Sequence, residues 1–322
     1  MLTAHNVRRI LIGFMAFAAG MPVAAQQVPD SGIIVTGQKQ SKERAITEQA
    51  RNVSIVGSPL DNPLARFEQR ICPGVMGLKE EAASYIVDRI RYNSEQLGLR
   101  LAADDGKCEP NFIVAVVDEA QTQLTELARR QGYMLAGLST DQRGELLDSS
   151  RAARVWVNTV TRTNTGMPVP SQRDAASTPE RTISFDASGS LVRMTLPPIA
   201  AGWASHSRIY FPTREDIVSV LVIFDGAEVR GKSLLQLADY ATMRGLALTR
   251  ETRGELAAAT ILSLFDSVAH EPERLTSFDL AYLTSLYDGI ANMPATSKLA
   301  GVSRRLGDEI ATSGSDGGTE AP

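Results

Sequence analysis

Short apolar runs alternate with segments of helical periodicity between residues 79 and 288, and this alternation restricts the fold to a combination of helices and strands. Apolar residues at helical spacing predict helices over 79–99, 119–132, 139–148, 233–244, 255–267 and 277–288. Apolar or alternating runs predict strands over 111–118, 153–163, 190–196, 206–211 and 216–225. The sequence therefore predicts the α+β class, with a mixed sheet packed with helices.

The predicted domain covers residues 65–305, a length that can bury a large core. Several Pro, Gly and Ser residues over 164–190 predict a long surface loop or a hairpin excursion. The polar stretch 26–64 lacks sustained periodicity and predicts a flexible arm, and the composition of 306–322 predicts a disordered tail. We therefore expect one domain with an arm before it and a tail after it.

Residues 1–25 have the organisation of a secretory signal peptide. Arg8 and Arg9 precede an apolar stretch, and Val23 and Ala25 occupy the small-residue positions of a cleavage site. We expect cleavage near Ala25 and a mature chain that is periplasmic or secreted. No later segment is apolar for long enough to predict a transmembrane span.

Charge and cysteine content narrow the function classes further. Cleavage removes two of the 33 basic residues and none of the 37 acidic ones, so the mature chain carries a formal charge of −6. That balance argues against a general nucleic-acid-binding role. The only cysteines are Cys72 and Cys108, and in an oxidising compartment we expect them to form a disulfide in preference to two free thiols.

The octapeptide GAEVRGKS at 226–233 matches the P-loop pattern, with a predicted strand before it and a predicted helix after it. Glu228 and the bulky Val229 stand where backbone amides would have to wrap around phosphates. Ser233 and Gln236 have the spacing of a capping box for the following helix. We interpret the match as coincidental.

The pattern L-T-x-F-D-x-x-x-L-x-x-L-Y-D occupies 275–288, after a predicted helix whose last residues include Gly245 and Leu246. With the strands before it, this order resembles a secreted proteobacterial family of unknown function. The core of that family is similar to the zincin-like fold of zinc metalloproteases. The resemblance covers about 80–300 and implies a single zincin-like domain.

The chain differs from the family at the residues that would bind zinc. Where the family carries an HExxH-like or HExxQ-like motif, this chain has Ala238, Asp239 and Thr242. The motif works because two histidines four residues apart on one helix face can share a zinc ion. The mature chain has only His206 and His270, which are far apart in the sequence. The resemblance therefore implies a degenerate, non-catalytic relative without a bound metal or other cofactor.

An apolar stripe along the same helix leaves Asp239, Thr242 and Arg244 on its other faces. Together with Arg214 and His206, these residues are candidates for a polar binding pocket at the place of the zincin cleft. A helix surface that carries ion pairs is one alternative. A hydrolase with a site near Asp239 and His206 is another.

The stretch SGIIVTGQKQ at 31–40 resembles the TonB box segment that opens mature TonB-dependent receptors. An extended segment in a flexible arm can add a strand to the sheet edge of a partner. The residues that would do so are Ile33, Ile34, Val35, Thr36 and Gly37. An unstructured leader of ordinary composition is the alternative.

These observations predict an exported cell-envelope protein with a binding or scaffolding role. Its partner would be an envelope protein or a small ligand, and a TonB-like protein if the arm docks.

Overall fold

The structure is a computed structural model that describes residues 32–55, 63–135, 138, 140–148, 151–169, 182–186, 191–195, 209–252, 254–267 and 271–315. The predicted signal peptide, His206 and His270 lie outside the described residues. The chain divides into two compact units, Met1–Lys39 and Gln40–Pro322. The second unit contains the sheet and its helices.

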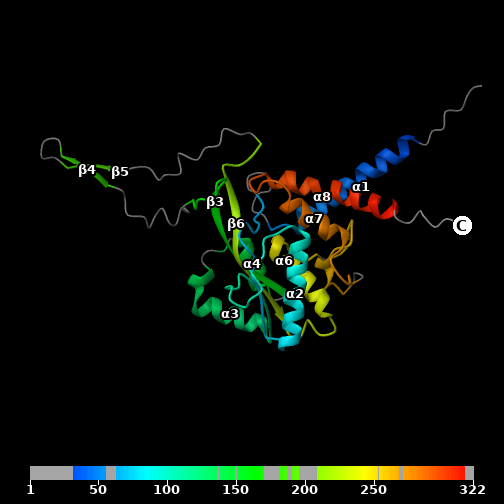
Figure 1. Ribbon diagram of the computed structural model, residues 1–322, viewed down its shortest axis with the longest axis horizontal. Helices are drawn as coiled ribbons and strands as arrows, with labels where there is room; N and C mark the ends of the chain where they lie inside the picture. The colour runs from blue at the N-terminus through cyan, green and yellow to red at the C-terminus, as the bar shows by residue number, and fades with distance from the viewer. Residues whose placement is uncertain are drawn as a thin grey trace, which may run out of the picture. The chain divides into compact units, whose positions relative to one another are not determined.

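A four-stranded mixed sheet forms the centre of this unit (Figure 1). Its strands, in spatial order, are β1 (Pro73–Met76), β2 (Phe112–Val117), β6 (Thr213–Asp225) and β3 (Ala153–Thr163). The first three are parallel, and β3 pairs with β6 in the antiparallel direction. Val222 pairs with Val114 on one side and with Val155 on the other, so β6 is an interior strand.

Different helices cover the two faces of the sheet (Figure 1). These helices are α2 (Glu80–Gln96) and α6 (Leu234–Ala247) on one face, and α3 (Ala120–Arg130) and α4 (Thr140–Leu147) on the other. Val222 and Phe224 of β6 belong to the larger core, whereas Ile223 belongs to the smaller one. Because successive side chains of a strand point to opposite faces, the continuous apolar run of β6 serves both cores.

The remaining elements complete the α+β fold. They are α7 (Ser277–Tyr287), α8 (Ala295–Ser315), the 3-10 turns Gly132–Leu135 and Ile261–Ser263, and the hairpin of β4 (Thr182–Asp186) and β5 (Leu191–Thr195). Helices α7 and α8 pack against each other, and α7 also contacts α6. No helix of the described part of the chain has both the length and the apolar character to cross a membrane.

Helix α1 (Gly32–Val53) lies where the sequence predicted a flexible arm. Ile46, Ala50 and Val53 are buried, at the spacing that places residues on one helix face. Just after the helix, the hydroxyls of Ser54 and Tyr282 share a hydrogen bond of 2.5 Å. A narrow apolar stripe therefore docks an otherwise polar segment on the core.

Three other predictions differ from the structure. Over 255–267 the chain forms only the short turn at Ile261–Ser263 in place of a helix. Residues 209–211, the described part of the strand predicted over 206–211, are not a strand. The predicted tail begins at 306, yet α8 continues to Ser315, and the buried side chain of Leu306 anchors this extension.

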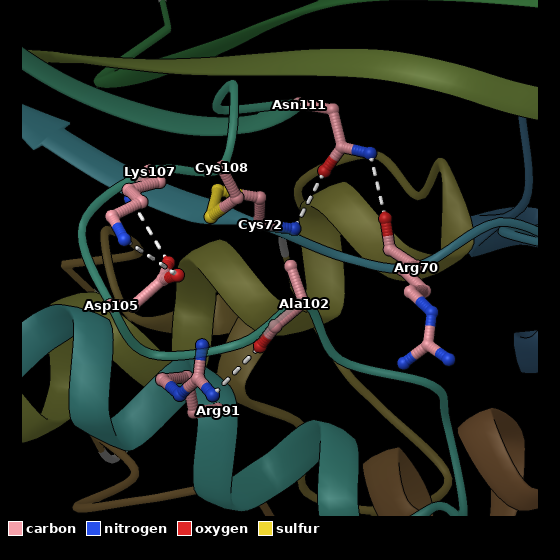
Figure 2. The surroundings of a disulfide bond; sticks show 8 residues. All are labelled: Arg70, Cys72, Arg91, Ala102, Asp105, Lys107, Cys108 and Asn111. Carbon is pink, nitrogen blue, oxygen red and sulfur yellow. Dashed lines mark hydrogen bonds and ion pairs between the residues drawn. A yellow bond between two sulfur atoms is a disulfide. The ribbon is translucent and has the colours of Figure 1, made fainter.

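The predicted disulfide between Cys72 and Cys108 is present (Figure 2). It joins the residue before β1 to the loop before β2. The Cys72 amide donates to Asn111 Oδ1 at 2.9 Å, and Asn111 Nδ2 donates to the Arg70 carbonyl at 2.9 Å (Figure 2). The covalent bond and the asparagine thus hold the beginnings of two adjacent strands together.

Candidate functional site

Helix α6 carries the positions at which the sequence resemblance would place a zinc motif, and it is buried on all sides from its second turn onward. The predicted capping box is confirmed: Gln236 N donates to Ser233 Oγ at 3.1 Å, and Ser233 N donates to Gln236 Oε1 at 2.9 Å. Asp239, Thr242 and Arg244 are each 0% exposed. The expectation that these three residues lie outside the buried face of the helix is therefore wrong.

Asp239 is a buried carboxylate surrounded by donors. Arg89 of α2 donates to it through Nε at 2.6 Å and through Nη2 at 2.9 Å. Asn93 Nδ2 donates at 2.8 Å, and so does the backbone amide of Leu275. The hydrogen bond to Asp239 raises the pKa of Arg89. A buried charge is stable only when it is paired and hydrogen-bonded, and this one joins α2, α6 and the segment before α7.

The other two positions on α6 also have internal partners. Thr242 Oγ1 donates to the Ala238 carbonyl at 2.8 Å and accepts from Asn93 Nδ2 at 3.1 Å. The guanidinium of Arg244 lies over the ring of Tyr240, 5.8 Å from its centroid. Tyr240 in turn donates to Glu251 Oε1 at 3.1 Å. Asp239 and Arg244 therefore belong to two different polar networks on the same helix.

Arg244 is incompletely paired in its network. Its Nη1 lies 3.4 Å from Tyr240 Oη, but its Nε and Nη2 have no hydrogen-bond partner among the described residues. Burial raises the pKa of the Tyr240 hydroxyl well above its ordinary value of 10, so this hydroxyl remains a neutral donor to Glu251. The carboxylate of Glu251 therefore reaches the buried Arg244 only through the hydroxyl of Tyr240.

Arg214 lies in a third network, at the far end of the β3–β6 pair. It lines a cleft of about 210 Å³, which we call the Arg214 cleft, together with Glu68, Arg162, Gly166 and Asp216. Arg214 Nε lies 2.9 Å from Asp216 Oδ1, and Arg162 Nε lies 3.2 Å from Asp216 Oδ2. The sequence suggested one pocket that contains both Arg214 and Asp239. In the structure the two residues belong to different networks. His206, the fifth predicted site residue, lies outside the described residues.

The acidic groups of the Arg214 cleft sit in a mixed environment. Burial raises the pKa of Asp216, while the hydrogen bond and the charge of Arg214 lower it. Burial also raises the pKa of the adjacent Glu215, which does not line the cleft and whose Oε1 accepts from Thr161 Oγ1 at 2.7 Å. Two guanidinium groups and two carboxyl groups, from Glu68 and Asp216, therefore face one opening.

Sequence reasoning missed the partners that build these networks. Arg66 Nε donates to Glu68 Oε1 at 2.7 Å, and Arg66 Nη1 donates to the Leu286 and Tyr287 carbonyls at 3.0 and 3.2 Å. Arg66 and Glu68 come from an irregular segment without periodicity, so no local pattern marks them. Arg89 and Asn93 lie four residues apart on a helix that was predicted, and this spacing was the one signal that could have indicated them.

The loop that matches the P-loop pattern uses its amides internally. Gly226 N donates to the Val117 carbonyl at 2.9 Å, and Glu228 N donates to the Asp225 carbonyl at 3.0 Å. The ammonium group of Lys232 forms an ion pair with Glu271. These contacts engage amides that a phosphate-binding loop would present to its ligand, which favours the interpretation of the match as coincidental.

The stretch predicted to dock a TonB-like partner forms the beginning of α1. Residues Ile33 to Gly37 are helical, whereas strand addition requires an extended segment. They also belong to the unit Met1–Lys39, separate from the unit that contains the sheet. Docking by strand addition would therefore require the first turns of α1 to unwind.

Within the described part of the chain, no group of three or more His, Cys, Asp or Glu side chains is arranged to hold a metal ion. Comparison of the chain with family models, with curated proteins and with solved structures finds no match. The similarity to a zincin-like family therefore remains a prediction from the sequence.

Proposed function

We propose that the chain is an exported, non-catalytic protein of the cell envelope with a binding or scaffolding role, in which the zinc-motif positions serve the core. The burial of Asp239 carries this proposal. Its carboxylate accepts four hydrogen bonds, from Arg89, Asn93 and Leu275, and has no exposed surface.

The chemistry of a zinc protease argues in the same direction. A catalytic zinc ion needs three protein ligands and an open position for water. The methyl group of Ala238 cannot be a ligand, and the oxygens of Asp239 are occupied by cationic and amide donors. A metal ion at this position would have to displace Arg89 and Asn93 from the carboxylate.

The Arg214 cleft supports a binding role better than the α6 positions do, because its charged groups reach solvent. The side chains of Arg162 and Arg214 are 28% and 18% exposed, and that of Glu68 is 23% exposed. The guanidinium groups suit a carboxylate or another anionic group of a ligand, and Glu68 suits a cationic one. The paired charges of the cleft fit a small ligand, or a side-chain pair of a protein partner, that carries both signs.

The zinc content of the purified mature chain tests the proposal, measured by elemental mass spectrometry with and without one added equivalent of zinc. We expect less than about a tenth of an equivalent, because a three-ligand site would retain zinc tightly. A peptidase and esterase screen of the same sample should show no turnover. About one equivalent of retained zinc, or turnover that Asp239→Asn abolishes in a folded protein, would contradict the proposal.

A further inference from the structure

A second and larger cleft, of about 690 Å³, lies beside the turn that connects α7 to α8. We call it the α7–α8 cleft. It does not share a lining residue with the Arg214 cleft and lies apart from the buried networks of α6. Three cations, Lys298, Arg304 and Arg305, line it, together with a single carboxylate, that of Asp288. This local excess of positive charge occurs in a chain whose formal charge is −4.

The three cations differ in their ion pairs and hydrogen bonds. Arg305 forms an ion pair with Asp288. The side chain of Arg304 has neither an ion pair nor a hydrogen bond with any residue that the structure describes. Lys298 is 9% exposed, and its ammonium group donates to the main-chain carbonyl of Asp288. Because an ammonium group has three donors, Lys298 retains donors for a ligand in the cleft.

The lining of the cleft also includes apolar side chains that are open to solvent. Ile290 is 47% exposed, and Tyr210 is 42% exposed. Hydrogen bonds from Phe211 N to the Asn292 carbonyl at 2.9 Å and from Asn292 Nδ2 to the Phe211 carbonyl at 2.6 Å hold the two segments together. The segments that carry the two apolar side chains are therefore fixed relative to each other, and exposed apolar groups at a cleft are typical of binding sites.

We propose that the α7–α8 cleft binds an amphiphilic anion, a molecule with a carboxylate or phosphate head and an apolar chain. Lys298 and Arg304 hold the head through charge-assisted hydrogen bonds. Ile290 and Tyr210 contact the chain. The inference concerns a different site from α6, so it stands or falls independently of the proposed lack of catalysis.

Calorimetric titration of the mature full-length chain with octyl phosphate, below its micelle concentration, tests the proposal. Octyl glucoside carries a chain of the same length without the charge, and inorganic phosphate carries the head without the chain. We expect saturable binding of octyl phosphate and at least tenfold weaker binding of each of the other two compounds. Absent binding of octyl phosphate, or equal binding of octyl glucoside, would overturn the proposal.

Variants separate the cleft from nonspecific association. Lys298→Met keeps most of the side-chain volume and should weaken octyl phosphate binding by about tenfold or more, since hydrogen bonds to charged groups are strong. Lys107→Met removes a lysine whose side chain is 83% exposed on the disulfide loop, and it should leave binding unchanged.

A second variant addresses the possibility that Lys298 only caps the end of α7. Arg304→Gln changes an exposed side chain that makes no ion pair or hydrogen bond with the described residues, so the fold should be retained. We expect it to weaken octyl phosphate binding severalfold, whereas Arg130→Gln on α3 should not. If both Arg304→Gln and a folded Lys298→Met bind octyl phosphate as the unmodified chain does, the cleft is not the site.

Vesicle flotation identifies the source of the ligand. Binding to phosphatidylglycerol vesicles, but not to phosphatidylcholine vesicles, that is lost in Arg304→Gln would assign a lipid headgroup at a membrane surface. Saturable binding of octyl phosphate without binding to vesicles would indicate that the ligand is a free amphiphile. Either result supports the proposed chemistry, and vesicle binding that is indifferent to Arg304→Gln counts against it.

Discussion

At the scale of single residues, Asp239 decides how α6 is interpreted. Asp239→Asn keeps the shape of the side chain but removes the charge opposite Arg89, and it turns an amide donor toward other donors. We expect the free energy of unfolding, measured by urea denaturation, to fall by about 3 kcal/mol, as for other broken buried pairs. The exposed Asp105→Asn is the matched control and should change stability by less than about 0.5 kcal/mol. A loss below about 1 kcal/mol for Asp239→Asn would show that the carboxylate is not a structural centre.

Arg244 leads to the opposite prediction, because two of its nitrogens lack partners among the described residues. Arg244→Met replaces a poorly paired buried cation with an apolar side chain of similar length. Such replacements are often neutral or stabilising, since the cost of desolvating the charge disappears. We expect the thermal unfolding midpoint to stay the same or to rise. A fall of more than about 2 kcal/mol in the free energy of unfolding would mean that Arg244 has stabilising partners besides Tyr240.

The role of a residue could be predicted from the sequence where that role depends only on its own side chain or on near neighbours in the sequence. The methyl side chain of Ala238 cannot bind a metal in any fold, and Ser233 and Gln236 form the expected capping box. The partner of Asp239 was not predictable, because Arg89 lies 150 positions away in the sequence and only packing of α2 on α6 brings it there. An acidic residue on a helix is usually solvated, so the local pattern favoured the wrong environment.

At the scale of elements, α1 shows how a polar segment can belong to the core. Deletion of residues 26–39 should leave the free energy of unfolding nearly unchanged, since these residues belong to the separate unit Met1–Lys39 and Ile46 is the first buried side chain from Gln40 onward. Deletion of residues 26–55 removes Ile46 and Val53 from the core and should cost about 3–6 kcal/mol, at about 1.5–3 kcal/mol for each large apolar side chain. Urea denaturation of the two truncated chains distinguishes these outcomes. Equal stability of both would mean that α1 does not pack as described.

Elements with their own periodicity and caps were predictable, and those defined by distant partners were not. The helix at α7 carries a capping box of Thr276 and Asp279, and the strand β3 has the predicted bounds. The segment 255–267 has helical spacing but does not form a helix. There, Asp279 accepts from the Ile261 amide at 2.7 Å and from the Thr260 hydroxyl, which holds the segment in a turn against α7. Tertiary hydrogen bonds outweighed a local preference worth only tenths of a kcal/mol per residue.

At the scale of the whole molecule, the end of α7 binds cations from two segments that are far apart in the sequence. Arg66 reaches from Glu68, at the Arg214 cleft, to the last carbonyls of α7. Lys298 reaches the next carbonyl, that of Asp288, from the α7–α8 cleft. Cations are favoured at the C-terminal end of a helix, where carbonyls lack partners. The same helix end therefore binds Lys298, which lines the α7–α8 cleft, and Arg66, whose partner Glu68 lines the Arg214 cleft.

The titration of Lys298 predicts how the free energy of unfolding of the whole chain depends on pH. Burial, followed by the charge of Arg66, lowers the pKa of Lys298 from 10.5 to about 8; Arg305 acts in the same direction, while Asp288 and Glu68 oppose the shift. Between about pH 8 and pH 10.5 the unfolded chain therefore holds a proton that the folded chain has lost, so this lysine makes stability rise with pH in that window. The free energy of unfolding of the unmodified chain should rise relative to Lys298→Met across it.

Binding should change in the opposite direction over the same pH range. Octanesulfonate keeps its charge at every pH, so it isolates the charge of the protein. Its affinity for the unmodified chain should fall as the pH increases through about 8, because the neutral amine no longer attracts the anion. Lys298→Met should show weak and nearly pH-independent binding. Calorimetric titrations between pH 6 and pH 10 measure both curves, and parallel curves for the two proteins would show that the amine of Lys298 does not contact the head of the ligand.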